Sequence, residues 1–367
     1  MAAFNGQLNI NKIYAFSYNM LLSQIVNSKN YTDAYSDFLN ASRTDVGLYG
    51  DQKPFYETYA PKISKWKGDD ESTDLLETKK YRVHGPECQT VQIDTQMKVV
   101  LVLDKYLTKN FWMNEAAFEE FNSTMLSWIR DVIGEYTRLT FNVFAGTEES
   151  STGKQQRTVN VTEKIGSATG EEANRIEAQA IAEDEMILCT DLMDNTVDYI
   201  DYGAKGMKRG FNKEDLVKLM PVSVAARIHK MDVPSLFHKD GLFEGIKTYV
   251  YPDRMFGKIN TSTKAGDGVA RSRIYQVLTG TDGKEYELLP GDFIPTVCTA
   301  PANTSYNEDN TILYKMFTKD SIPWLDQFEA SGSFYNVQAL NEKYVTVIGH
   351  NTLEHLAGKP CITVRKA

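Results

Sequence analysis

Cysteine, histidine and long apolar runs are scarce in this chain. Its 367 residues include four cysteines and five histidines, and the cysteines are widely separated, with no CxxC pair. That spacing argues against the common zinc motifs and against a disulfide framework. The longest continuous apolar run, at 99–103, is far shorter than the ~20 residues that cross a bilayer. We therefore expect no metal site and no membrane span.

Motifs for catalysis and cofactor binding are also missing. Segment 146–154 has six residues between its glycines instead of the four of a phosphate-binding loop, and Gln155 stands where a Mg²⁺-binding hydroxyl is needed. His350 and His355 are five residues apart, about 140° around a helix, so one metal ion could not bind both from a single face. The sequence predicts no catalytic, metal-binding or cofactor-binding residue, and a protein that is not an enzyme.

Negative charge predominates, with a formal net charge of −9 and an isoelectric point near 5.2. An acidic surface argues against tight binding to nucleic acid or to an anionic membrane. The N-terminal residues lack a basic stretch followed by an apolar one, so no secretory signal peptide is expected. The composition, 42% hydrophobic and 24% charged, is that of a globular protein with a sizeable core.

Segment 91–103 predicts an unusually long strand. Val91, Ile93, Thr95, Met97, Val99, Leu101 and Leu103 share one face at period two, and the opposite face turns apolar at Val100 and Val102. Segment 79–89 predicts a partner strand with a turn at Gly85-Pro86. A lone hairpin is only marginally stable in water. The apolar face of this ribbon must therefore rest on its own subunit or on a neighbouring one.

A long amphipathic helix is predicted directly after the ribbon, from about 114 to 139. It would be ~38 Å long, roughly twice the usual length in globular proteins. Its apolar positions recur in steps of three and four, which places them in one stripe that we expect to be core. These residues are Phe118, Phe121, Met125, Trp128, Ile129, Val132 and Tyr136.

Shorter elements follow the helix. Segment 140–148 predicts a strand, and 171 to about 202 predicts a second helix with Ile176, Ala180, Ile187, Leu188 and Leu192 on its apolar side. Residues 211–334 alternate strands and short helices with proline and glycine turns, and 343–367 predict two further strands. The expected fold class is α+β.

The order of these parts resembles the major capsid proteins of tailed bacteriophages, which have the Hong Kong 97 fold. The resemblance is carried by 93–147, IDTQMKVVLVLDKYLTKNFWMNEAAFEEFNSTMLSWIRDVIGEYTRLTFNVFAGT. Segment 241–257, GLFEGIKTYVYPDRMFG, is similar to a strand and turn of the axial domain in the same group. The capsid proteins of small short-tailed phages are the most similar.

The resemblance implies five regions. They are an N-terminal arm (1–50), an extended β-ribbon called the E-loop (51–105), a peripheral (P) domain with a long spine helix (106–204), an axial (A) domain (205–335), and C-terminal strands that return to these domains (336–367). In this family the E-loop reaches a neighbouring subunit. The candidate intersubunit residues are Lys65, Trp66, Lys67, Asp69, Asp70, Glu71, Lys79, Lys80 and Arg82.

By the same resemblance the chain would be a structural virion protein. It would assemble with itself as pentamers and hexamers into an icosahedral shell around double-stranded DNA, in the host cytoplasm. It would contact the packaged DNA only weakly and non-specifically, and it would work with a portal. Because the sequence begins close to the arm, a separate scaffolding protein is also implied. No cofactor and no membrane partner are expected.

Three other interpretations stay open on the sequence. An encapsulin-type cellular compartment shares the fold. A cytosolic α+β enzyme could have a site dispersed along the chain, which only burial of a perturbed acid or base would reveal. A portal or tail protein would also belong to a virion, although such proteins usually have longer helical or β-repeat sections.

Overall fold

The computed structural model describes residues 36–59, 85–104, 115–148, 156–195, 198–205, 207–230, 246–261, 270–336, 338 and 341–367. Its α-helices are α2 (Asp37–Ser42), α5 (Glu115–Gly146), α6 (Val161–Ile165), α7 (Glu171–Met193) and α8 (Val222–Lys230). Short 3-10 turns are η1 (Asp201–Lys205), η2 (Lys213–Asp215) and η3 (Asp253–Met255). Helices and strands are mixed throughout, so the α+β prediction is confirmed.

The strands form two main sheets and two small ones. The six-stranded sheet contains β1 (Arg43–Gly47), β2 (Gln52–Glu57), β3 (Glu87–Asp104), β14 (Trp324–Gln327), β15 (Ala330–Asn336) and β16 (Asn341–Asn351). The five-stranded sheet contains β5 (Gln156–Val159), β6 (Leu216–Pro221), β7 (Lys247–Tyr251), β13 (Ile312–Thr318) and β17 (Cys361–Lys366). A lobe holds β4 (Thr147–Glu148), β8 (Gly257–Ile259), β9 (Ala270–Ser272) and β12 (Ser305–Glu308), with the hairpin β10 (Gln276–Thr279) and β11 (Glu285–Leu288).

The predicted long strand is confirmed as β3, which has 18 residues. It pairs antiparallel with β16 from Ile93 to Asp104 and with β2 from Glu87 to Gln92. The predicted partner strand at 79–89 is wrong in its described part, because Glu87–Gln89 continue β3 itself. The true partners come from 52–57 and 341–351, so pairing between distant segments replaced the local hairpin.

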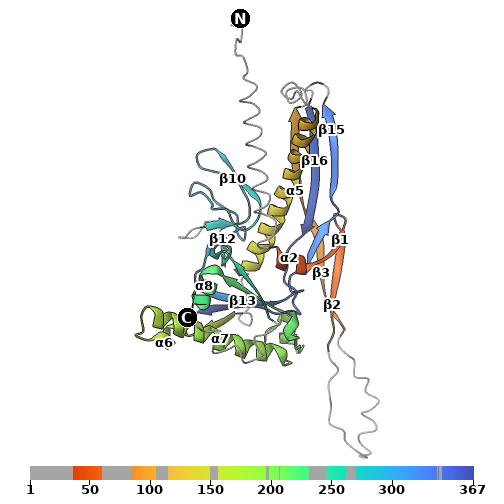
Figure 1. Ribbon diagram of the computed structural model, residues 1–367. Helices are drawn as coiled ribbons and strands as arrows, with labels where there is room; N and C mark the ends of the chain where they lie inside the picture. Colours follow the sequence, from red (N-terminus) through yellow and green to blue (C-terminus); the bar gives the residue numbers. More distant parts are fainter. Residues whose placement is uncertain are drawn as a thin grey trace, which may run out of the picture.

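Where side-chain burial is described along β3, the apolar face of this strand is covered by residues of the same subunit. Val91 and Ile93 are fully buried and pack with Leu325, Leu356 and Phe55. The same face continues half-buried toward α5, which lies along β3 and β16 (Figure 1).

Helix α5 is longer than predicted, with 32 residues ending at Gly146. The strand predicted at 140–148 is wrong except for the two residues of β4. Phe141, Val143 and Ala145 are completely buried. A helix that enters the core can be apolar on every side, so its sequence loses the helical period.

Lys315 of β13 binds backbone carbonyl groups at the C-terminal end of α5. Its ammonium donates hydrogen bonds to the carbonyl oxygens of Ala145, at 2.7 Å, and Thr147, at 2.8 Å, and the residue is fully buried. The last carbonyls of a helix have no partner inside the helix, and a cation is favourable there. This contact joins the helix end to the five-stranded sheet.

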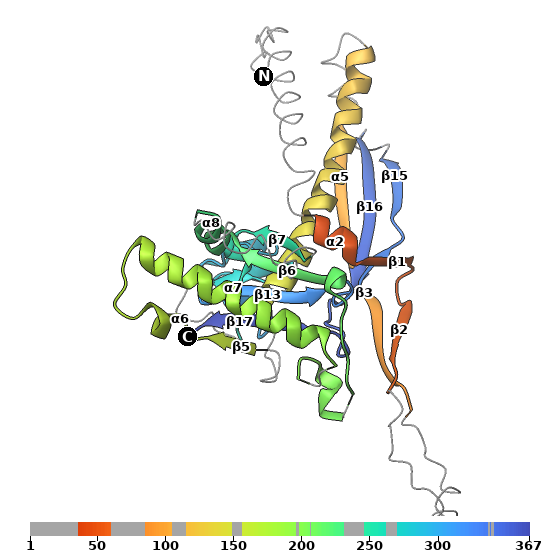
Figure 2. The same cartoon turned by 60° about the horizontal axis from the view of Figure 1, so that its bottom comes forward.

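The five-stranded sheet is the middle layer of a three-layer core (Figure 2). Leu216 and Met220 of β6 face the cluster that includes α7, while the alternate residues Val217 and Leu219 face the cluster that includes α2 and the end of α5. Alternation along a strand sends side chains to both faces. The last two predicted strands are confirmed as β16 and β17, one in each main sheet.

Helix α7 contacts this sheet through buried charges as well as apolar residues. Asp184 and Glu185 are buried and pair with Arg157 of β5 at 2.6 Å and with Lys218 of β6 at 2.7 Å. Glu177, also buried, pairs instead with Arg227 of α8 at 2.9 Å. The predicted apolar side is correct for Ala180, Leu188 and Leu192 but wrong for Ile187, which is exposed. The carboxylates occupy part of the face that sequence assigned to apolar residues. The helix also ends at Met193, earlier than predicted.

Candidate assembly surfaces

The candidate intersubunit residues lie in the sequence between β2 and β3. These strands pair from Gln52 opposite Gln92 to Glu57 opposite Glu87. Lys65, Trp66, Lys67, Asp69, Asp70, Glu71, Lys79, Lys80 and Arg82 belong to 60–84, outside the described residues. Their intersubunit role therefore stays a prediction.

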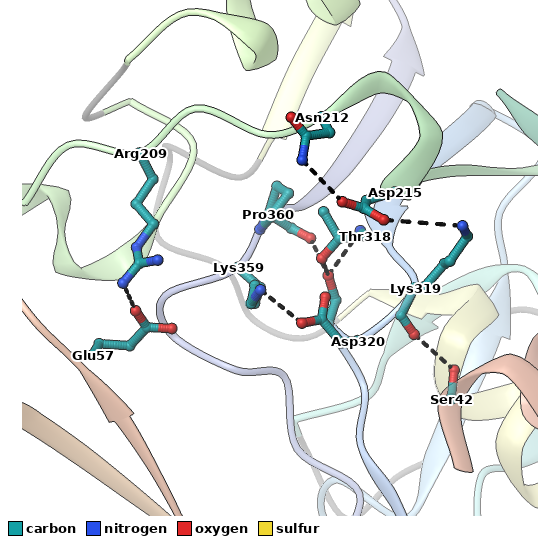
Figure 3. Close-up of polar contacts among 11 residues, drawn as sticks. Ser42, Glu57, Arg209, Asn212, Asp215, Thr318, Lys319, Asp320, Lys359 and Pro360 are labelled. Atoms are coloured by element: carbon teal, nitrogen blue, oxygen red, sulfur yellow. Dashed lines mark hydrogen bonds and ion pairs between the residues drawn. The ribbon is translucent and has the colours of Figure 1, made fainter. Parts of the chain in front are cut away.

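The base of the ribbon formed by β2 and β3 is attached to the body of its own subunit by charged side chains. Arg209 forms an ion pair with Glu57 of β2, and Figure 3 shows this pair bridging the ribbon and the loop before η2. On the other strand, Lys205 Nζ lies 2.8 Å from Glu87 Oε2. Both strands are therefore attached at the point where the described ribbon ends.

A second attachment uses the segment between β16 and β17. Gln89 Nε2 donates to the carbonyl of His355 at 3.1 Å, and the Ala357 N–H donates to Gln89 Oε1 at 2.9 Å. The same segment is held further along by Lys359, whose ammonium lies 2.7 Å from Asp320 (Figure 3). Burial alone would raise the pKa of Asp320, but the hydrogen bond and charge of Lys359 leave it below its ordinary value. The base of the ribbon is thus held by hydrogen bonds and ion pairs to its own subunit.

Sequence reasoning missed these attachment residues because no local signal marks them. Glu57 and Arg209 are 152 positions apart, and single charged residues in loops are common. Only the tertiary fold shows which of them pair.

Burial varies along the predicted stripe of α5. Ile129 and Tyr136 are buried and Trp128 is half-buried, but Val132 is 49% exposed. The side chains of Phe118, Phe121 and Met125 lie outside the described part of the chain. Val132 is about 60° around the helix from Ile129. A sheet covers only a narrow face of a helix, so the flank of the stripe stays open.

Tyr136 makes the central contact between α5 and the six-stranded sheet. Its hydroxyl lies 2.9 Å from His350 Nε2, and the His350 ring stacks on Trp324 with centroids 4.8 Å apart. Burial raises the pKa of Tyr136 to about 12 and lowers the pKa of His350 below its ordinary value. Both groups are therefore neutral at pH 7, and their hydrogen bond connects helix and sheet.

Two hollows flank the Tyr136–His350 contact. One has a volume of about 210 Å³ and lies toward Thr95 and Met97, while the other has about 380 Å³ and lies toward Asp326 and Phe328.

Within the described ranges, no group of three His, Cys, Asp or Glu side chains could hold a metal ion. No helix in the same part of the chain is both long and apolar enough to span a membrane.

The six-stranded sheet presents apolar residues on the face turned away from α5. We call this the outer apolar face and define it by Val100 and Val102 of β3, Val345 of β16 and Phe334 of β15. Val102 is 51% and Phe334 67% exposed. The exposed Lys343 of β16 lies between Val102 and Phe334 on this face. Exposed apolar side chains gathered on one face of a sheet are typical of a site of association. The outer apolar face is therefore a candidate assembly surface.

Chains with a similar fold are found in solved structures of bacteriophages. The chain is similar to one in the capsid structure of Staphylococcus phage Andhra, with a TM-score of 0.62 and 12% identity, covering 92% of this chain and 86% of that one. It is also similar to a chain in the structure of the head fiber and inner core protein of native bacteriophage P68, with a TM-score of 0.56 and 13% identity, covering 90% and 84%.

No family model and no curated protein sequence matches this chain. The likeness is therefore one of fold, and it covers 92% of this chain for the first of these structures and 90% for the second. The chain has the fold found in tailed-phage capsid structures, as the sequence resemblance implied.

Proposed function

We propose that this chain is a major capsid protein of a tailed bacteriophage, assembling as pentamers and hexamers into an icosahedral shell around double-stranded DNA. The observation that carries the proposal is the likeness to a capsid structure over 92% of the chain.

The surface of the subunit supports association with other copies. The outer apolar face exposes valine and phenylalanine to solvent in the isolated chain, and burial of apolar area gives ~25 cal/mol per Å². Modest interfaces of this kind, repeated under closed symmetry, hold a shell together. The net charge of −9 is consistent with an inner wall that adsorbs packaged DNA weakly.

The region assignments belong to the same proposal. The arm is 1–50, the E-loop 51–105, the P domain with its spine helix 106–204, the A domain 205–335, and the returning strands 336–367. In the core, β5 belongs to the same sheet as β6, β7 and β13, and α7 packs on that sheet, so the proposed P and A regions adjoin closely. A separate scaffolding protein, a portal, and assembly in the host cytoplasm complete the proposed setting.

Electron microscopy of the purified chain, alone and with its candidate scaffolding protein, tests this function. We expect closed particles tens of nanometres across, with pentamers at fivefold axes and hexamers between them. A folded chain that stays monomeric at high concentration with the scaffolding protein present would contradict the proposal. Particles that contain a cellular cargo protein and are formed without phage partners would instead indicate a compartment shell.

A further inference from the structure

The edge of the six-stranded sheet at β15 differs from the other edges of that sheet. β15 pairs with β16 on one side, and none of the described strands pairs with its other side. Exposed edges usually carry charges or proline, which block pairing with another chain. β1 has Arg43 and Asp45, and β2 has Lys53 and Pro54. The seven residues of β15, ASGSFYN, include neither.

The sequence of β15 is complementary in size to itself in the antiparallel direction. A pair centred on Ser333 places Phe334 opposite Gly332 and Tyr335 opposite Ser331. Phe334 is largely exposed, and a Cβ added at Gly332 would meet no atom within 4 Å. Opposite residues on one face of an antiparallel pair contact each other, and an aromatic ring can cover an edge glycine. Each aromatic side chain thus lies opposite a small residue, which leaves room for its ring.

We propose that β15 pairs antiparallel with β15 of a second copy of this chain, across a twofold axis at Ser333. This inference rests on the proposed function, because a closed shell of pentamers and hexamers places copies on either side of twofold axes. The ring of Phe334 in each copy lies over Gly332 of the other, beside Val345, which is opposite Gly332 in the register of β15 and β16. Two six-stranded sheets become continuous, and the outer apolar faces join.

A cysteine at the axis tests this pairing directly. The exposed Cys88 is first replaced by serine, since Cys189, Cys298 and Cys361 are buried. In a Ser333→Cys variant, the two new cysteines have Cα atoms about 4.5–5.5 Å apart, within the ~4.4–6.8 Å range of a disulfide. Under mild oxidation we expect more than half of the chain to run as a disulfide-linked dimer on a non-reducing gel.

The matched control is Ser331→Cys, on the same strand and equally open to solvent. In the proposed register the two copies of this residue are about 14 Å apart, so the variant stays monomeric on the gel. Adding Tyr335→Cys to Ser331→Cys places cysteines opposite each other and restores the dimer band. Recovery of the dimer band shows that the two strands pair in the proposed register and are not merely close to each other.

The assay is run on particles and, in parallel, on unassembled chain at high concentration. Particles in which Ser333→Cys does not cross-link, or in which Ser331→Cys cross-links as fully, overturn the pairing and leave the shell function standing. Absence of particles from the native chain overturns the shell function. In that case the same comparison of the two cysteines in concentrated chain still decides whether β15 pairs with itself.

Discussion

At the residue scale, the apolar core of this protein contains a few charged side chains, each with a polar or oppositely charged partner. Lys315 is fully buried and binds the carbonyls at the end of α5. Three carboxylates of α7 are buried against arginine and lysine. A buried charge without its partner is strongly destabilising, even though the pair itself can contribute little. These residues therefore fix the arrangement of layers more than they add to total stability.

Removing one carboxylate from α7 tests this view. Glu185→Gln leaves the ammonium of Lys218, whose side chain is only 12% exposed, without a negative partner, and we expect the free energy of unfolding to fall by about 3–5 kcal/mol. The neighbouring residue supplies the control. Glu183, with a side chain that is 65% exposed, pairs with Lys164, and Glu183→Gln is expected to cost about 0–1 kcal/mol. Urea denaturation of both variants compares them, and equal losses would contradict the buried-pair argument.

His355 predicts a dependence of stability on pH. Burial, followed by the charges of Lys315 and Arg273, holds its pKa well below the ordinary value of 6.5. Between the folded pKa and 6.5 the unfolded chain binds more protons than the folded one, so the free energy of unfolding falls as pH drops below 6.5.

The variant His355→Gln isolates this contribution. It loses the stacking of His355 on Phe144, at 4.8 Å between centroids, so its melting temperature at pH 7.5 is lower than that of the native chain. The decrease from pH 7 to pH 5.5 is expected to be smaller in the variant. Thermal melts at several pH values measure both, and parallel curves would show that His355 does not titrate on unfolding.

At the element scale, α5 changes its environment along its length. Its middle covers the six-stranded sheet with one face, and its end is surrounded by core. Phe141, inside the predicted strand, packs edge-on against Phe38 at 5.2 Å and Trp324 at 6.0 Å. One helix therefore belongs to both main parts of the subunit.

Two truncations on this helix separate its faces. Phe141→Ala is expected to lower the free energy of unfolding by about 3–5 kcal/mol, because it leaves a cavity at a fully buried site. Val132→Ala, at the exposed flank, is expected to change it by less than about 0.5 kcal/mol. Denaturation of the unassembled chain measures both. A native-like stability for Phe141→Ala would mean that the end of α5 does not lie in the core.

At the scale of the whole molecule, the ribbon of β2 and β3 is the element that we propose to lead toward a neighbouring copy. Its base is attached to the subunit by Glu57, Glu87 and Gln89, so replacing the segment beyond the base should not disturb the core. We expect a chain in which a short Gly/Ser linker replaces 65–82 to be a soluble monomer with near-native circular dichroism. The same chain should fail to form closed particles, which electron microscopy would reveal.

A charge-reversal variant provides a comparison for the assembly defect expected of the linker variant. Changing Asp69, Asp70 and Glu71 to lysine should weaken assembly more mildly and in a salt-dependent way, since exposed ion pairs contribute about 0–1 kcal/mol each. An unfolded linker variant would place the segment in the core of its own subunit. Normal particles formed by the linker variant would show that the E-loop assignment is wrong.

The sequence alone determined the elements whose period repeats many times. Strand β3 and helix α5 were predictable because each carries enough repeats to distinguish a period of two from a period of 3.6, and the resemblance that they carry implied the fold.

The tertiary structure decided everything that depends on distant residues. It alone shows that α5 continues to Gly146, that β3 pairs with 52–57 and 341–351, and that Val132 is exposed. It also brings Lys315 to Ala145, 170 positions away. The physical reason is the same in each case: a pattern of polarity records that a side chain is covered, but the identity of the covering residue is set only when the layers pack.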